Sequence, residues 1–203
     1  MTTLAKQITY IKEKVYAASL LSPYKQDVKI IAVTKTHPPE VLKEAYDCGL
    51  KEFGENRVQE LLAKKHSLPQ DITWHLIGPL QSNKVKAVLP HVHLIHSLDR
   101  ESLAEEIDKR AEILGINAHV LIEVNVAREN TKHGIFVEEI SDFLHYLSGK
   151  ENLTVKGLMT VAPFCDNPEE VRWVFRKLYE KYSELQTKQY QNQRYKILHK
   201  ILL

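Results

Sequence analysis

Short apolar runs alternate with longer amphipathic segments along this chain, and that alternation limits the folds it can adopt. In the run at 29–34 both faces are apolar, as in a strand that is buried on both sides. The sequence predicts strands at 29–34, 52–56, 73–78, 92–99, 118–126 and 153–161. It predicts helices at 3–21, 38–49, 57–66, 82–89, 100–115, 137–148 and 167–186. Six strand–helix units in strict order predict a parallel sheet covered by helices.

Two α/β architectures fit this pattern, a doubly wound open sheet and a β/α barrel. Open sheets that bind nucleotides carry a G-x-G-x-x-G turn or a P-loop after a strand. Neither motif follows any of the expected strands. Both architectures bind ligands at the carboxyl ends of their strands, so the residues at those ends are the first candidates for a ligand site.

Bulk composition excludes several classes of function. The net charge of +2 gives no global field that would favour nucleic acid or an anionic membrane. No apolar run approaches the length of about 18 residues that a spanning helix needs, and the charged N-terminus has no signal-peptide core. The two cysteines, Cys48 and Cys165, have no motif spacing, which indicates a reducing cytoplasm.

The stretch "VKIIAVTKTHPPE" (28–40) ends an apolar strand with a lysine. Lys35 shares strand parity with Ile31 and Val33, so the three side chains are expected on one face. On the inner face of a barrel the ammonium would be partly desolvated, which disfavours its charged form. A neutral amine is what attack on an aldehyde requires. The alternative is a lysine at a strand end with its head in solvent.

Other candidates carry less chemistry. His91, His93 and His96 lie in "HVHLIH", but no carboxylate or cysteine nearby completes a metal site, so no metal is expected. Glu52 and Glu55 have opposite strand parity, which argues against an acid–base pair. The polar loop at 125–134 is either an active-site loop or an exposed turn.

Six blocks in register resemble one family, the pyridoxal 5′-phosphate (PLP) homeostasis proteins. They are "AVTKTHP", "FGENRVQELLAK", "WHLIGPLQSNKVK", "IHSLDRESLAEEIDKRA", "VLIEVNVARENTKHG" and "VKGLMTVAPF". The resemblance implies a TIM-type (β/α) barrel like the N-terminal domain of alanine racemase. It also implies a protein that binds PLP as a lysine aldimine in the cytoplasm, without catalytic turnover, and that serves PLP-dependent apo-enzymes.

Site residues follow from the same resemblance. Lys35 matches the aldimine lysine of the family, and Asn56 matches a pocket residue near the cofactor ring. Four further residues match strand positions that line the barrel mouth: His75, Ser97, Asn125 and Met159. Neither a nucleic acid nor a membrane is expected as a partner, and we expect a monomer or a weak dimer.

The resemblance ends near Gln186, after about six of the eight β/α units of the family. We therefore expect an incomplete barrel over residues 1–186 and a divergent basic tail over 187–203. Without a seventh and an eighth strand, the first and sixth strands would be unpaired edges unless a dimer or the tail filled the gap. Loss of the family's phosphate-binding segments predicts weak PLP binding with little selectivity for the phosphate.

Two other functions remain open at this stage. One is a PLP-dependent enzyme of the racemase or decarboxylase barrel class, although 203 residues leave no room for the second domain of such racemases. The other is binding of RNA or anionic lipid by the tail, which offers four basic residues but no aromatic platform beyond Tyr190 and Tyr195.

Overall fold

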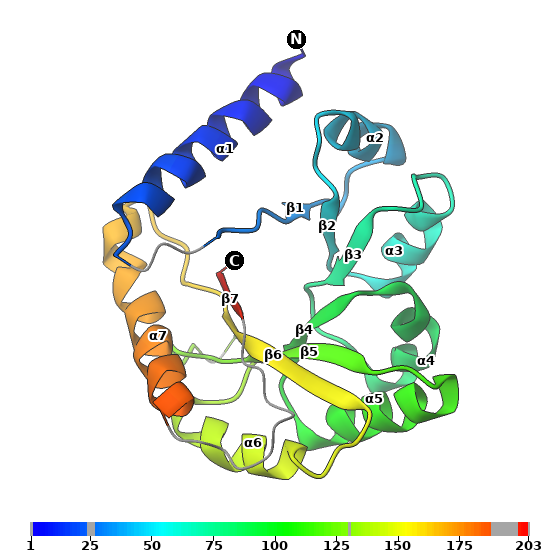
Figure 1. Cartoon of the computed structure of the whole chain (residues 1–203), viewed down its shortest axis with the longest axis vertical. Coiled ribbons are helices and arrows are strands. Elements are labelled where there is room, and N and C mark those ends of the chain that lie inside the picture. The colour runs from blue at the N-terminus through cyan, green and yellow to red at the C-terminus, as the bar shows by residue number, and fades with distance from the viewer. Residues whose placement is uncertain (1, 24–26, 130, 188–198, 203) are drawn as a thin grey trace. The chain divides into compact units, whose positions relative to one another are not determined.

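The computed structural model describes residues 2–23, 27–129, 131–187 and 199–202. By its contacts the chain divides into a first unit, residues 1–75, and a second unit, residues 76–203. Each unit is built of strands that follow one another in the sheet in chain order, with helices between them (Figure 1). A doubly wound sheet would reverse its strand order at a switch point. Within each unit the order is therefore that of a β/α barrel.

The first unit holds three helices and the first strands. Its helices are α1 (Thr3–Leu21), α2 (Pro39–Asp47) and α3 (Val58–Lys65). Its strands are β1 (Ala32–Val33), β2 (Glu52–Glu55) and β3 (Thr73–Leu76), the last of which ends at the boundary between the units. The core of this unit includes Phe53 and Trp74, whose ring centroids lie 6.0 Å apart.

Strand β1 is shorter than the stretch 29–34 that the sequence predicts. It pairs in parallel with β2, with Ala32 opposite Phe53 and Val33 opposite Gly54. Among the described residues β1 has no second neighbour in the sheet. Only the residues that meet β2 therefore form a ladder, and the side chain of Val33 stays 42% exposed.

The second unit holds four strands, which pair in parallel from β4 to β7. They are β4 (Leu94–Leu98), β5 (Ala118–Glu123), β6 (Leu153–Thr160) and β7 (His199–Leu202). Its helices are α4 (Val85–Val88), α5 (Glu101–Leu114), α6 (Ile140–Leu147) and α7 (Arg172–Thr187). Single 3₁₀ turns precede α4, α6 and α7, and another, Leu89–His91, follows α4.

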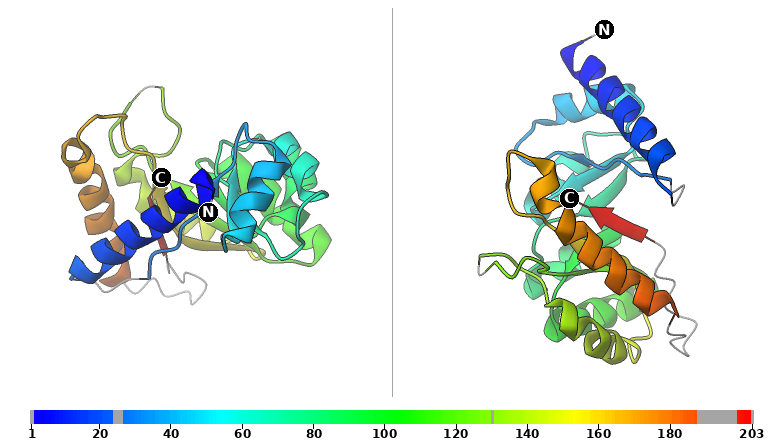
Figure 2. Two further views of the ribbon diagram at one scale, coloured as in Figure 1. Left: turned by 90° about the horizontal axis from the view of Figure 1, so that it is seen from above. Right: turned by 90° about the vertical axis from the view of Figure 1, so that its left-hand side faces the viewer.

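Helices of this unit cover the sheet through apolar faces. Helix α5 buries Leu103, Ala104, Ile107 and Ala111 and contacts β5 and β6. Helix α7 buries Val174 and Leu178 and contacts β6 (Figure 2). Asn167 starts the last helical segment as the sequence predicts, because its side chain accepts a hydrogen bond from the Glu169 N–H.

The sixth strand is not an unpaired edge, because part of the tail pairs with it. Residues 199–202 form β7, which pairs with β6 from Gly157 opposite His199 to Thr160 opposite Leu202 (Figure 1). This is the alternative in which the tail supplies a strand. The sequence pattern does not predict this strand, because the basic, glutamine-rich stretch before β7 has no strand–helix pattern.

Two shifts of register also escaped the sequence pattern. Strand β4 carries one extra residue against β5 between Ile95 and Leu98. Strand β6 carries one extra residue against β5 between Val155 and Gly157. Each bulge turns the following side chains to the other face, so simple alternation fails beyond it.

Candidate functional site

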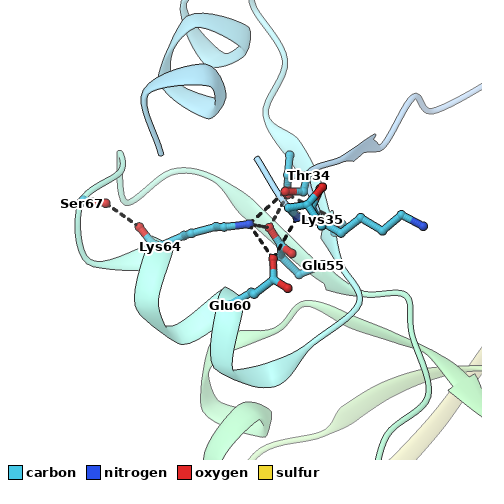
Figure 3. Close-up of polar contacts among 8 residues, drawn as sticks. Thr34, Lys35, Glu55, Glu60, Lys64 and Ser67 are labelled. Carbon is cyan, nitrogen blue, oxygen red and sulfur yellow. Dashed lines mark hydrogen bonds and ion pairs between the residues drawn. The ribbon is translucent and has the colours of Figure 1, made fainter. Parts of the chain in front are cut away.

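Lys35 lies directly after β1, at the carboxyl end of the strand. Its side chain is exposed, so the desolvated pocket expected for it is not present in the structure. The reason is that β1 has no second neighbour among the described strands, which leaves the face of Val33 and Lys35 uncovered. Its ammonium makes no hydrogen bond or ion pair with any residue that the structure describes (Figure 3). The amine is therefore available to a ligand.

Asn56 directly follows β2, and Lys35 lies just beyond the end of its partner strand β1. The parallel register ends with Val33 opposite Gly54, and the Thr34 N–H donates to the Gly54 carbonyl at 3.0 Å. Lys35 itself lies in the turn that follows the strand. The Oδ1 atom of Asn56 is buried and has no hydrogen-bond partner among the described residues. An amine and an unsatisfied amide oxygen thus lie at the carboxyl ends of two paired strands.

A network of charged side chains lies on the other side of the backbone at this strand end. Lys64, Glu55, Glu60 and Thr34 are joined by hydrogen bonds, and the Lys35 side chain extends away from them (Figure 3). Sequence reasoning missed this network. The pattern that could have found it is the three-residue spacing of Val58, Leu61 and Lys64, which are the buried residues of α3.

His75 is occupied by another contact. Its Nε2 lies 2.7 Å from Oε2 of Glu52, which also pairs with Lys29 at 2.7 Å. Burial raises the pKa of Glu52, but the hydrogen bonds from His75 and Lys29 outweigh burial and leave that pKa lowered. Glu52 begins β2, whereas Lys35 and Asn56 follow the ends of their strands. The contact made by His75 therefore faces the opposite end of the sheet from Lys35.

Ser97 and Met159 lie in the second unit, where both are buried. The Oγ atom of Ser97 has no hydrogen-bond partner among the described residues, so it could receive or donate a bond to a ligand. Met159 packs with Leu94 and Leu121 in an apolar cluster. The surroundings of Met159 are those of a core residue, and its role at a barrel mouth stays a prediction.

Asn125 organises the polar loop that follows β5. Its Oδ1 accepts from the Glu129 N–H at 3.1 Å, and its Nδ2 donates to the Glu129 carbonyl at 2.9 Å. The loop returns to the sheet at Ile135, which bridges to Val124. Both ends of the Asn125 amide are therefore engaged within the loop, and its role at a cofactor site stays a prediction.

Glu123 is a titratable group that the sequence did not single out. It shares with Asn125, Lys132 and His133 the lining of a cavity of about 180 Å³ at the end of β5. Burial, and to a lesser degree the nearby charge of Asp99, raise the pKa of Glu123 to about 7. A carboxyl group that titrates near neutrality is common at functional sites. The pattern that could have found it is its position two residues before Asn125, at the end of β5.

Metal ligands do not gather in the part of the chain that the structure describes. No group of three or more His, Cys, Asp or Glu side chains there could hold a metal ion. His93 and His119 make an edge-to-face ring contact with centroids 5.7 Å apart, which gives His93 a partner other than a metal.

Comparison with known proteins places this geometry in a family. The model of the alanine racemase N-terminal domain matches residues 11–199. The PLP homeostasis protein of Aquifex aeolicus is 52% identical over 159 residues, which are 78% of this chain and 70% of that protein. The corresponding protein of Helicobacter pylori (strain ATCC 700392 / 26695) is 42% identical over 159 residues, 75% of this chain and 72% of the relative.

The chain belongs to the pyridoxal phosphate homeostasis protein family. The fold of that family agrees with solved structures. PipY of Synechococcus elongatus with PLP bound has a TM-score of 0.76 and 34% identity, over 92% of this chain and 83% of PipY. An alanine racemase of Clostridium difficile, 17% identical with a TM-score of 0.65, shows the same fold over 80% of this chain and 44% of its own. The expected TIM-type (β/α) barrel, like the N-terminal domain of alanine racemase, is confirmed.

Proposed function

We propose that this chain binds pyridoxal 5′-phosphate and serves in the homeostasis of that cofactor, with Lys35 as its covalent anchor. The observation that carries the proposal is that the amine of Lys35 and the unsatisfied oxygen of Asn56 both come from the carboxyl ends of two paired strands. Close relatives that bear the name of PLP homeostasis proteins, and PipY solved with PLP, support it.

The residues present fit such a cofactor. The cofactor supplies an aldehyde carbon to which a neutral lysine amine adds, with loss of one water. Lys35 offers an amine that makes no competing ion pair with the described residues. Asn56 and Ser97 each hold a buried oxygen whose hydrogen-bond partner is absent from the described part of the chain, and buried polar atoms of this kind normally have one. We infer that Asn56 contacts the bound cofactor, and Ser97 remains a predicted site residue.

We further propose that the chain holds the cofactor without turning over a substrate, and that it acts in the cytoplasm in exchange with PLP-dependent apo-enzymes. Both cysteines are free thiols, in agreement with a reducing compartment. Among the described residues, no helix is long and apolar enough to cross a bilayer. His75, Asn125 and Met159 remain predicted site residues, and a monomer or weak dimer remains the predicted state of association.

The decisive experiment is to incubate the protein with PLP, reduce it with borohydride, and map the adduct by peptide mass spectrometry. We expect one adduct per chain on Lys35, and none there in Lys35→Ala. Lys86→Ala, which changes an exposed lysine of α4, is the matched control and should label like the wild type. Substoichiometric labelling scattered over surface lysines would contradict the proposal.

Two further measurements separate the alternatives. Racemisation or decarboxylation of amino acids by the PLP-loaded chain, lost in Lys35→Ala, would favour an enzyme over a homeostasis protein. Parallel labelling with pyridoxal and PLP tests the predicted weak preference for the phosphate. Equal labelling agrees with that prediction, whereas a strong preference for PLP refutes it and leaves the role of Lys35 intact.

A further inference from the structure

A second lysine is buried directly behind the strand end that presents Lys35. The side chain of Lys64 is 9% exposed and that of Glu55 is fully buried, and their Nζ and Oε1 atoms lie 2.7 Å apart. A buried ion pair is weak evidence for stability, because desolvation of both charges offsets their attraction. The hydrogen bonds of the pair show which neighbouring residues it holds in place.

The pair holds Thr34, the residue before Lys35. Lys64 donates from Nζ to the Thr34 carbonyl at 2.9 Å. Glu55 accepts at Oε1 from the Thr34 hydroxyl at 2.6 Å. Both the main chain and the side chain of Thr34 are therefore tied to the same two charges, and the plane of the peptide that leads into Lys35 is fixed.

Glu60 holds the residue on the other side. Its Oε2 accepts from the Thr36 N–H at 3.0 Å and from Nζ of Lys64 at 3.1 Å. These hydrogen bonds, first from Thr36 and then from Lys64, lower the pKa of Glu60, so it stays ionised at neutral pH. Thr36 has φ 65°, a left-handed conformation that a residue with a Cβ rarely adopts unless its surroundings impose it.

We propose that Glu55, Glu60 and Lys64 form a clamp that positions the amine of Lys35 for the cofactor carbonyl by fixing the residues on both sides of it. This inference rests on the proposed PLP binding. The three are positioning residues, since none of their bonds reaches the Lys35 side chain, which extends away from the clamp (Figure 3). Lys64 is not itself the anchor, because its amine already meets two carboxylates and a carbonyl.

Glu60→Ala opens the clamp at its partly exposed end and leaves the buried Glu55–Lys64 pair intact. Gln59→Ala, at an exposed position one residue earlier on α3, is the matched control. In the cofactor-free protein, hydrogen exchange of the Thr36 amide should become about tenfold faster or more in Glu60→Ala and stay unchanged in Gln59→Ala. This readout does not depend on cofactor binding.

With PLP and borohydride, the rate of adduct formation at Lys35 should fall about ten- to a hundredfold in Glu60→Ala, the range in which misplacement of a reacting group acts. Labelling of Lys35 by acetic anhydride needs only exposure and should not change. The double variant Glu55→Gln/Lys64→Met removes both buried charges together. Provided that its melting curve stays cooperative, it should lose adduct formation in the same proportion.

The outcomes are distinct. Wild-type protein without a Lys35 adduct overturns both the proposed function and the clamp. A wild-type adduct together with an unchanged rate in Glu60→Ala and in the double variant overturns the clamp alone. A loss of the Lys35 adduct together with increased anhydride labelling across many lysines in Glu60→Ala would show that the change acts on folding, and it would also overturn the positioning role.

Discussion

At the scale of single residues, Lys64 carries its charge in a nearly dry environment. The cost of such a charge appears when its partner is removed, because the remaining ion is buried and unpaired. We expect Lys64→Met to lower the free energy of unfolding by about 3–5 kcal/mol, since Glu55 is then left with its charge in the interior. Urea unfolding at pH 7 measures the effect.

The control for Lys64 is the double variant Glu55→Gln/Lys64→Met, in which no charge is left behind. Replacement of a buried pair by neutral groups is often close to neutral for stability. The double variant should therefore be more stable than Lys64→Met alone. If both lose the same free energy, the loss comes from altered packing and not from the charge of Glu55.

Glu123 predicts a pH dependence of stability. Its pKa is about 7 in the folded protein against an ordinary value of 4.5, so the folded state binds the proton more tightly. The stability this gives is complete below pH 4.5 and is lost as the pH rises to about 7. Glutamine cannot ionise. We therefore expect the free energy of unfolding of Glu123→Gln at pH 8 to be about 1–3 kcal/mol higher than that of the wild type, a range that allows for the partial exposure of the carboxyl.

Urea unfolding at pH 4.5 and pH 8 checks this expectation. The advantage of Glu123→Gln should be small at pH 4.5, where the carboxyl of the wild type is protonated in the folded state. Glu112→Gln, at an exposed position of α5, is the control. An advantage of Glu123→Gln that is equal at both pH values would contradict the raised pKa as its cause.

Sequence position singles out one kind of candidate residue and misses another. Lys35 stands out because a lysine at the end of an apolar run is visible in the sequence. Lys64 does not, because a lysine near the end of a helix normally lies in solvent, and its burial depends on Glu55 and Thr34, which lie outside α3. The raised pKa of Glu123 likewise depends on neighbours that become close only in the folded chain.

At the scale of elements, the loop from Asn125 to Ile135 is held in a tight turn by Gly134. Its φ is 108°, and a Cβ added there would lie 2.8 Å from the Asn125 nitrogen. We expect Gly134→Ala to lower the free energy of unfolding by about 2–4 kcal/mol, from the disfavoured φ together with the clash. Thermal or urea unfolding measures this loss.

Gly115, which ends α5, separates the effect of the disfavoured φ from that of the steric clash. It also has a left-handed φ, 62°, but an added Cβ would meet nothing within 4 Å. Gly115→Ala should therefore cost only the conformational part, about 1 kcal/mol. A loss in Gly134→Ala no larger than that in Gly115→Ala would contradict the close approach to Asn125.

Helices and strands were predictable to different extents. Helix α1 spans Thr3–Leu21 as the spacing of its apolar residues predicts, and Asn167 starts its segment as expected. The bulges in β4 and β6 were not predictable, because alternation describes one strand and register is a property of two. The continuous helix expected at 82–89 is interrupted, since Pro90 stands in the turn that follows α4.

At the scale of the whole molecule, β7 covers the edge of β6, which would otherwise be open. It pairs with four residues of β6, which otherwise would present an eight-residue edge strand with a largely buried, apolar side-chain set. Such edges recruit other chains and promote aggregation. The strand was unpredictable because parallel pairing over a long connection leaves no local pattern.

Truncation after Thr187 tests this role. We expect the shortened chain to be less stable to urea and to form oligomers in size-exclusion chromatography, because the edge of β6 is then open. Removal of Leu203 alone keeps the whole of β7 and serves as the control. A truncated chain that remains monomeric with unchanged stability would show that β7 contributes nothing to the sheet.

The clamp binds Thr34 and Thr36 on either side of Lys35 and makes no bond to the Lys35 side chain. The side chain at position 35 can therefore be replaced without disturbing the hydrogen bonds that hold the neighbouring backbone. Lys35→Cys, alkylated with bromoethylamine, would place a thioether amine of nearly the same length at position 35. This chemically restored amine should recover the adduct with PLP. Alkylating agents with shorter or longer carbon chains would then measure the distance between the end of β1 and the carbonyl carbon of the bound cofactor.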